Sequence, residues 1–322
     1  MTIRIWSTSP SFGYFAAGPV NFLKSLGYEV DLVPQGKKLS EEEMIRSVKD
    51  YDAIIAGIMP ISGPIIKAAP KLRIIAQHGV GVNHIDVKAA SEKGIVVTNA
   101  PGGNSDAVAD LTMGLFISLA RRIPYADRLV RNGQWAPIVG NQVSGKVLGI
   151  VGLGQIGKKV AQRGVGFNMK VLAYDVFKDY EFAKKWGIQY LSLDDVLAQA
   201  DYISMHVPLS PETNKLIGER ELRLMKKDAC LVNVARGTIM DEESLYRVLK
   251  EGRIKGAALD VFSNEPPTGN PLLTLDNVIV TPHMGGYTIE TLEEVGMICA
   301  KNIVEVMNGR PPQFVVNSEV LK

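Results

Sequence analysis

The amino-acid sequence predicts an α/β protein with two parallel-sheet domains of the Rossmann or flavodoxin-like kind. Short apolar runs alternate with helix-like stretches along the whole chain, a rhythm that favours strand–helix–strand units and parallel sheets. A length of 322 residues is enough for two domains of ordinary size. The content of 46% hydrophobic and 22% charged residues is typical of a globular protein.

In the first part of the chain, we expect strands near residues 3–6, 29–33, 53–56, 73–76 and 95–97. Ser40 followed by three glutamates predicts the start of a helix, because a serine cap and carboxylates favour its positive end. A longer helix is expected over 106–122, bounded by Ser105 and Pro124. Its apolar residues cover most of its circumference, which predicts burial at a domain or subunit junction.

The second part of the chain predicts strands near residues 147–151, 170–174, 188–190, 202–206, 230–234, 256–260 and 278–280. A final helix is expected over 289–308, ended by Pro311 and Pro312. We expect this helix to return to the first domain. The predicted boundaries are residues 1–100 with 288–322 for the first domain, and residues 101–287 for the second.

Composition and charge exclude several classes of protein. A net charge of +2 is too small for a nucleic-acid surface, which needs a clustered basic face. Cys230 and Cys299 lie far apart, without the spacing of a metal site or a disulfide framework, so we expect no metal. No apolar run is long enough to span a membrane, and the N-terminus resembles a strand rather than a signal peptide. We therefore expect a cytoplasmic protein without nucleic-acid or membrane partners.

A glycine-rich turn follows the predicted strand at 147–151. Gly152 permits a tight turn, Gly154 lets the backbone approach a pyrophosphate, and Gly157 lets the following helix pack closely on the strand. The start of that helix would present free N–H groups to phosphates. Asp175 ends the next strand, 18 residues after Gly157, where an acid meets ribose hydroxyls. The negative charge of Asp175 would repel the 2′-phosphate of NADP, so this residue predicts NAD as the cofactor.

Three polar residues follow three other strands of the same predicted sheet. Arg236, Glu265 and His283 each lie beyond the carboxyl end of a strand, at the edge that also carries the glycine turn. His283 has the chemistry to take the hydroxyl proton as a hydride leaves, and Glu265 would stabilise the resulting imidazolium. Arg236 offers a planar fork for a substrate carboxylate. The combination predicts hydride transfer between NAD and a hydroxy acid.

With these residues in place, the chain resembles the D-isomer-specific 2-hydroxyacid dehydrogenases, and most of all their 3-phosphoglycerate dehydrogenase branch. The best-matched stretches are residues 79–86, 99–105, 152–157, 233–237, 257–262 and 281–286. The resemblance implies two domains around a cleft, usually in a homodimer built on the helix near 106–122. It also assigns the catalytic roles to Arg236, Glu265 and His283.

The resemblance further implies which residues surround the ligands. Around the cofactor it places Gly152, Gly154, Gln155, Ile156, Gly157, Asp175, Val207, Pro208, Ala235, Asp260 and Gly285. The substrate would be held by Arg236 together with backbone N–H groups in the turn formed by Gly79, Val80 and Gly81.

Some departures bear on the substrate. The phosphoglycerate branch often carries a basic residue where this chain has Gln77, and frequently another just after the residue matching Trp135, where Ala136 and Pro137 stand. His78, Arg73 or a partner subunit would then have to supply the cation that a phosphate needs. Because the sequence ends at Lys322, we do not expect the C-terminal regulatory domain of some phosphoglycerate dehydrogenases.

The predicted function is an NAD-dependent D-2-hydroxyacid dehydrogenase, with 3-phosphoglycerate as the first substrate to test. A glyoxylate or hydroxypyruvate reductase, or an enzyme for another small anionic hydroxy acid, is the alternative within the same class. A remote alternative is a binding protein that senses NAD(H), similar to the transcriptional corepressors that share this fold.

Overall fold

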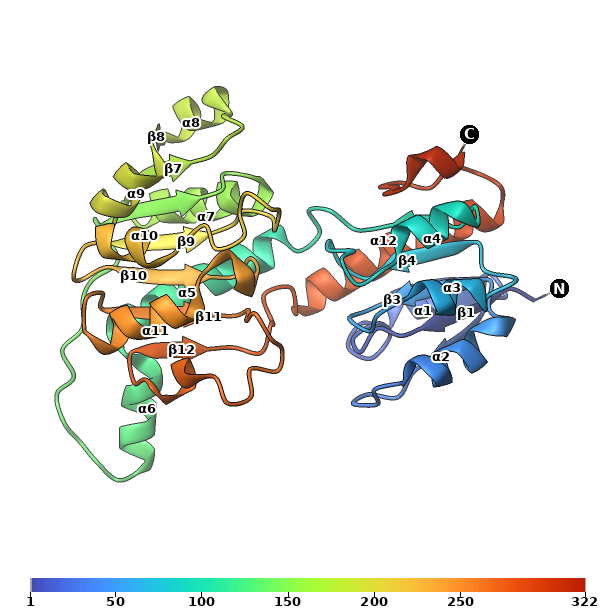
Figure 1. Ribbon diagram of the computed structural model, residues 1–322, viewed down its shortest axis with the longest axis horizontal. Helices are drawn as coiled ribbons and strands as arrows, with labels where there is room; N and C mark the ends of the chain where they lie inside the picture. Colours follow the sequence, from blue (N-terminus) through green and yellow to red (C-terminus); the bar gives the residue numbers. More distant parts are fainter. Residues whose placement is uncertain (1, 322) are drawn as a thin grey trace. The chain divides into compact units, whose positions relative to one another are not determined.

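The computed structural model describes residues 2–321, which form two compact units. The first unit comprises the chain up to residue 104 and from residue 286 onward, and the second comprises residues 105–285. Each unit is a parallel β-sheet with helices packed against it, as Figure 1 shows for each. The predicted α/β fold class with two parallel-sheet domains is confirmed.

The first unit contains a five-stranded sheet in the order β2-β1-β3-β4-β5. Its strands are β1 (Arg4–Ser7), β2 (Glu29–Leu32), β3 (Ala53–Ala56), β4 (Ile74–Gln77) and β5 (Val96–Thr98). The helices of this unit are α1 (Gly18–Ser25), α2 (Glu41–Ser47), α3 (Gly63–Lys67), α4 (Val87–Glu92) and the long α12 (Ile289–Met307). Helix α12 lies against α1 and β4, so the end of the chain completes the layer that covers one face of this sheet.

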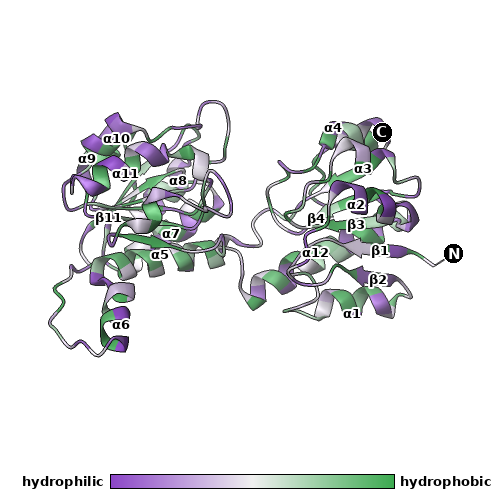
Figure 2. Cartoon of the chain, turned by 60° about the horizontal axis from the view of Figure 1, so that its bottom comes forward, coloured by the Kyte–Doolittle hydropathy of each residue, from purple (hydrophilic) through white to green (hydrophobic). Residues whose placement is uncertain are grey.

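The second unit contains a seven-stranded sheet in the order β12-β11-β10-β9-β6-β7-β8. Its strands are β6 (Val147–Val151), β7 (Lys170–Tyr174), β8 (Gln189–Tyr190), β9 (Tyr202–Met205), β10 (Cys230–Asn233), β11 (Gly256–Leu259) and β12 (Val278–Val280). Helices α5 (Ser105–Arg121), α6 (Ile123–Arg131), α7 (Gln155–Gly166), α8 (Tyr180–Trp186), α9 (Leu193–Gln199), α10 (Glu219–Leu224) and α11 (Glu242–Lys250) complete the unit. In Figure 2 the strands are mostly green and many helices carry purple outer turns, as expected for a sheet buried between two helical layers.

The predicted strands are confirmed to within one residue at almost every boundary. The long helix expected over 106–122 is α5, and its predicted burial is also confirmed. Its apolar surface packs on α7, β10 and β11 within its own unit, with Phe116 fully buried against Tyr202. The apolar surface of α5, which the sequence predicted to be buried at a domain or subunit junction, is covered by the sheet and α7 of its own unit.

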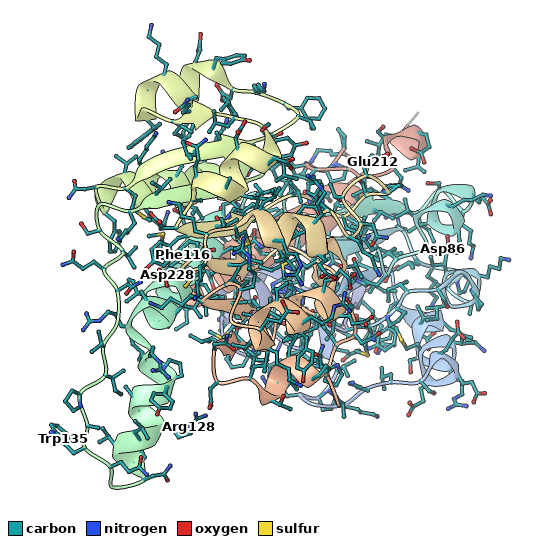
Figure 3. The ribbon with its side chains drawn as sticks, turned by 60° about the vertical axis from the view of Figure 1, so that its left-hand side comes forward. Asp86, Phe116, Arg128, Trp135, Glu212 and Asp228 are labelled. Carbon is teal, nitrogen blue, oxygen red and sulfur yellow. The ribbon has the colours of Figure 1, made fainter. Side chains whose placement is uncertain are left out.

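Helix α6 is different, because none of its residues is buried. It stands away from the sheet of its unit in Figure 1, and a long segment leads from it back to β6. Trp135 and Val139 in that segment are 91% and 89% exposed. Figure 3 shows Trp135 and Arg128 at the outer end of this projection, which we call the α6 arm (residues 123–140).

Both cysteines are free thiols inside the sheets' cores. Burial raises the pKa of Cys230 and of Cys299 to about 12, so neither is a thiolate at neutral pH. Across residues 2–321, no three His, Cys, Asp or Glu side chains gather in an arrangement suited to a metal ion. None of the helices described in this range combines the length and apolar character that crossing a lipid bilayer requires.

Candidate active site

The polar residues predicted for the site lie on one edge of the seven-stranded sheet. Strands β11, β10, β9 and β6 are consecutive neighbours, and all their pairings are parallel. Their carboxyl ends therefore meet at one edge, where open α/β sheets bind ligands. The segments that leave this edge begin at residues 152, 206, 234 and 260, and the segment after β12 begins at residue 281.

The glycine turn between β6 and α7 has the backbone geometry that its sequence predicts. Gly152 has φ +97°, and a Cβ there would lie 2.8 Å from the backbone of His206 and Val207. A Cβ on Gly157 would lie 2.1 Å from the Gly152 carbonyl oxygen. Gly154 is extended and leaves the start of α7 without a side-chain cap. The first N–H groups of this 12-residue helix are thus available to a pyrophosphate.

Asp175 follows β7 and is tied to the same turn. One carboxylate oxygen accepts the N–H of Leu153 at 2.6 Å, and the other accepts the N–H of Phe177 at 2.8 Å. The acid is therefore held beside the glycine turn, and its remaining lone pairs can accept ribose hydroxyls. Together the turn, the helix start and the acid fit a dinucleotide.

Arg236 leaves the end of β10 in a turn fixed by Asn233. The Asn233 amide donates to the carbonyl of Arg236 at 2.9 Å and accepts the N–H of Ala235 at 3.0 Å. A Cβ on Gly237 would lie only 1.9 Å from the backbone of Phe262, so this turn presses on the segment that leads to Glu265. The Arg236 guanidinium donates to the carbonyl of Ala235 at 2.6 Å, and its other N–H groups can bind a carboxylate.

Glu265 and His283 are brought together as the sequence predicts. Nδ1 of His283 lies 2.8 Å from Oε2 of Glu265, and the two side chains are 49% and 39% exposed. The other oxygen of Glu265 accepts the N–H of Phe262 at 3.1 Å. Because the carboxylate occupies Nδ1, that nitrogen carries the proton and Nε2 is the atom that can exchange a proton with a ligand.

Asp260 has a role that sequence reasoning missed. It is 1% exposed, and its oxygens accept hydrogen bonds from the Thr281 hydroxyl at 2.6 Å and from the N–H groups of Met284 and Gly285, both at 2.8 Å. These bonds hold the segment that carries His283, whose own φ of 52° is unusual for a residue other than glycine. The sequence feature that could have revealed this role is the position of an acidic residue directly after the buried strand β11.

His206, at the end of β9, differs from His283. Both of its ring nitrogens are buried, and neither has a hydrogen-bond partner among the described residues. Burial lowers the pKa of His206 to about 3. The ring is therefore uncharged at neutral pH, next to Val207 and Pro208.

The residues predicted to bind substrate through their backbone belong to the first unit. The carbonyl of Gly79 accepts the N–H of Ala100 at 2.9 Å, and the carbonyl of Val80 accepts the Asn99 amide at 2.8 Å. No hydrogen bond between described residues uses the N–H of Val80 or of Gly81. We call residues 79–81 the amide turn, a backbone arrangement suited to binding an anion.

The sequence and the structure both match known proteins. The family model of the D-isomer specific 2-hydroxyacid dehydrogenase NAD binding domain matches residues 113–285. A glyoxylate reductase of Korarchaeum cryptofilum is 43% identical over 303 residues, with 92% of this chain and 91% of that protein covered. A D-3-phosphoglycerate dehydrogenase of Methanocaldococcus jannaschii is 44% identical over 293 residues, covering 90% of this chain but only 56% of the relative. The TT0316 protein of Thermus thermophilus has a similar structure, with a TM-score of 0.90, 35% identity and coverage of 98% of this chain and all of that one.

The glycine turn makes a testable prediction. Gly157→Ala places a methyl group against the Gly152 carbonyl, so we expect a loss of about 2–3 kcal/mol of stability and at least tenfold weaker NADH binding. Gly166→Ala is the matched control, because a Cβ at the far end of the same helix meets nothing within 4 Å. Chemical denaturation and NADH fluorescence measure both quantities, and equal effects of the two variants would contradict the role of Gly157.

Proposed function

We propose that this chain, which belongs to the D-isomer-specific 2-hydroxyacid dehydrogenases, reduces small unphosphorylated 2-oxo acids such as glyoxylate and hydroxypyruvate. Family membership makes it an NAD-dependent oxidoreductase acting on CH–OH groups. The chemistry within that class follows from the residues at the carboxyl edge of the second unit's sheet. In this proposal, the second unit holds NAD and the first unit supplies carboxylate-binding amides.

The mechanism assigns one task to each polar residue. When bound, NADH supplies the hydride for the carbonyl carbon. His283 donates the proton on Nε2 to the carbonyl oxygen, and in the reverse direction it accepts the hydroxyl proton there. Glu265 accepts the hydrogen bond from Nδ1 and fixes the orientation of the ring. Arg236 binds the substrate carboxylate and favours the negative charge that develops on the carbonyl oxygen.

The lack of positively charged side chains in the segments around the amide turn is the main argument for an unphosphorylated substrate. At the carboxyl edge of the first sheet, residues 8–17, 57–62, 78–86 and 99–104 follow β1, β3, β4 and β5, and none is Lys or Arg. Lys37 and Lys38 follow β2, which is three strand positions from β4, or about 14 Å. A phosphate dianion close to the amide turn would have no guanidinium or ammonium from these four segments to pair with.

Gln77, which stands where a basic residue would be expected, and the possible substitutes His78 and Arg73 all have other interactions or no charge. The Gln77 amide donates to the carbonyl of Gly57 at 3.3 Å, and its oxygen lies 3.0 Å from Nε2 of His84. Burial lowers the pKa of His78 to about 4, so its ring is uncharged at neutral pH. The Arg73 guanidinium donates to the carbonyls of Val306 and Met307 on α12. The carboxyl edge of the first unit's sheet is therefore suited to bind a single carboxylate rather than a carboxylate and a phosphate.

A 3-phosphoglycerate dehydrogenase is the second candidate. The 44% identity to the enzyme of that name from Methanocaldococcus jannaschii favours it. It requires a cation from outside the four segments that surround the amide turn, such as a residue from a second copy of the chain.

Steady-state reduction with NADH separates the two candidates. We expect kcat/KM for hydroxypyruvate or glyoxylate to exceed that for 3-phosphohydroxypyruvate by about 100-fold or more, because the phosphate loses charge-assisted hydrogen bonds to water without gaining new ones. A preference for the phosphorylated acid would support the second candidate instead. An absence of turnover with every 2-oxo acid would refute the proposal.

His283→Ala tests the proton donor. We expect kcat to fall by about 10³-fold or more, since no other group would protonate the carbonyl oxygen, while the dissociation constant of NADH changes less than about threefold. Glu265→Gln keeps a hydrogen bond to the ring but removes the charge, so a smaller loss in kcat is expected. Turnover of His283→Ala within tenfold of the unmodified enzyme would remove His283 from this role.

The α6 arm supports a homodimer. Ile123 and Val130 on α6 and Trp135 beyond it are exposed by 47%, 54% and 91%, and large exposed apolar side chains in one region mark interaction surfaces. We expect the unmodified protein to sediment as a dimer at micromolar concentration, and Val130→Asp with Trp135→Ala to shift it to a monomer with an unchanged melting profile of the core. A monomeric unmodified protein at these concentrations would be inconsistent with this assembly.

A further inference from the structure

A buried polar cluster lies directly beside the amide turn and is not used by the mechanism above. Nδ1 of His78 lies 3.1 Å from the hydroxyl of Ser9 and 3.3 Å from that of Ser11. Ser9 and Ser11 are 2% and 3% exposed. The ring of Phe12 meets the His78 ring edge to face, with centroids 5.6 Å apart. The cluster joins the loop after β1 to the residue immediately before Gly79.

The hydrogen bonds around Ser9 favour one direction for its contact with His78. The Ser9 oxygen accepts the N–H groups of Ser11 and Phe12, both at 3.4 Å. Because two backbone N–H groups engage its lone pairs, we assign the Ser9 proton to Nδ1 of His78. The Ser11 hydroxyl lies 3.2 Å from that of Ser9 and 3.3 Å from Nδ1, so it is a second hydroxyl within reach of the same nitrogen. Nδ1 is then the accepting nitrogen, and the ring proton resides on Nε2, which is buried near the backbone of Leu292 on α12.

The backbone around the amide turn is held at three points by hydrogen bonds to neighbouring segments. The N–H of His78 donates to the carbonyl of Ala56 at 2.8 Å, and the carbonyls of Gly79 and Val80 accept bonds from Ala100 and Asn99. Gly79 has φ +155°, so a side chain at this position would be strained. The carbonyls of Gly79 and Val80 are bonded to the segment after β5, whereas the N–H groups of Val80 and Gly81 have no hydrogen-bond partner among residues 2–321.

We propose that His78 is a positioning residue, which is held by the Ser9 hydroxyl and fixes the direction of the Val80 and Gly81 amides toward the substrate carboxylate. This inference rests on the proposed function, because it needs a substrate carboxylate on the amide turn. The ring itself does not bind the anion, since it is uncharged and its accepting nitrogen faces Ser9. The ring acts indirectly, by holding the backbone at His78 and so orienting the peptide groups that follow it.

Two variants separate this role from simple core packing. His78→Phe retains a ring against Phe12 but cannot accept the serine proton. Ser9→Ala removes that proton and leaves the imidazole. Ser7→Ala is the matched control, because Ser7 lies two residues earlier on β1 and is fully buried, and its hydroxyl has no partner among the described residues.

We expect His78→Phe to raise the KM of the better 2-oxo acid about tenfold, with kcat and the KM of NADH within about threefold of the unmodified enzyme. Ser9→Ala should raise the same KM about fivefold, and the double variant should be no worse than His78→Phe alone, because both changes remove one interaction. Oxamate, an unreactive analogue with the same carboxylate, should show parallel losses in affinity for the NADH complex. Ser7→Ala should change none of these constants.

The outcomes distinguish this inference from the function on which it rests. An active enzyme whose 2-oxo acid KM is unchanged in His78→Phe and Ser9→Ala, or in which the two effects add fully, overturns the role of His78 alone. The same is true if Ser7→Ala has an equal effect. An unmodified enzyme that neither reduces a 2-oxo acid nor binds oxamate overturns both proposals. Thermal melting identifies a misfolded His78→Phe protein, and Ser9→Ala then decides the question.

Discussion

The buried carboxylate of Asp260 holds in place the segment that carries His283 at the candidate active site. It is buried at the end of β11 and accepts three hydrogen bonds from the segment that carries His283. A buried carboxylate is costly unless it is satisfied, so the segment after β12 and the acid stabilise one another. This arrangement keeps His283 in a left-handed backbone conformation and its ring within 2.8 Å of Glu265. Without Asp260, the segment that carries His283 would lose these three hydrogen bonds.

Parallel pairing then determines which residues can share the site. The carboxyl ends of β6, β9, β10 and β11 lie side by side, because these strands are neighbours in the sheet. The glycine turn, Arg236 and Asp260 therefore emerge at one edge although they are far apart in the sequence. Gly237 shows how closely neighbouring turns pack there, since even a methyl group would overlap the backbone of Phe262. The catalytic residues are positioned by backbone contacts between these turns as much as by their own side chains.

The sequence was sufficient for features that depend on local order. Strand boundaries follow from apolar runs, and the turn from Gly152 to Gly157 follows from glycine spacing, since only glycine tolerates the contacts at these points. The pairing of Glu265 with His283 could be expected because both follow strands at one edge. By contrast, the three bonds of Asp260, the contact of Gly237 with Phe262 and the contact of Ser9 with His78 join segments that are distant in sequence. No periodicity or spacing encodes such contacts, so only the folded chain reveals them.

His283 and His78 differ in their properties because their environments differ. His283 is half-exposed, and its Nδ1 lies 2.8 Å from the Glu265 carboxylate, which leaves Nε2 facing away from this partner. His78 is enclosed by serine hydroxyls and Phe12, and its lowered pKa keeps it neutral. An additional positive charge near the amide turn would favour dianions over monoanions, so a neutral His78 orders the amides without broadening the range of anions that they accept. In the roles that we propose, the same type of side chain transfers a proton at one segment and orients backbone amides at the other.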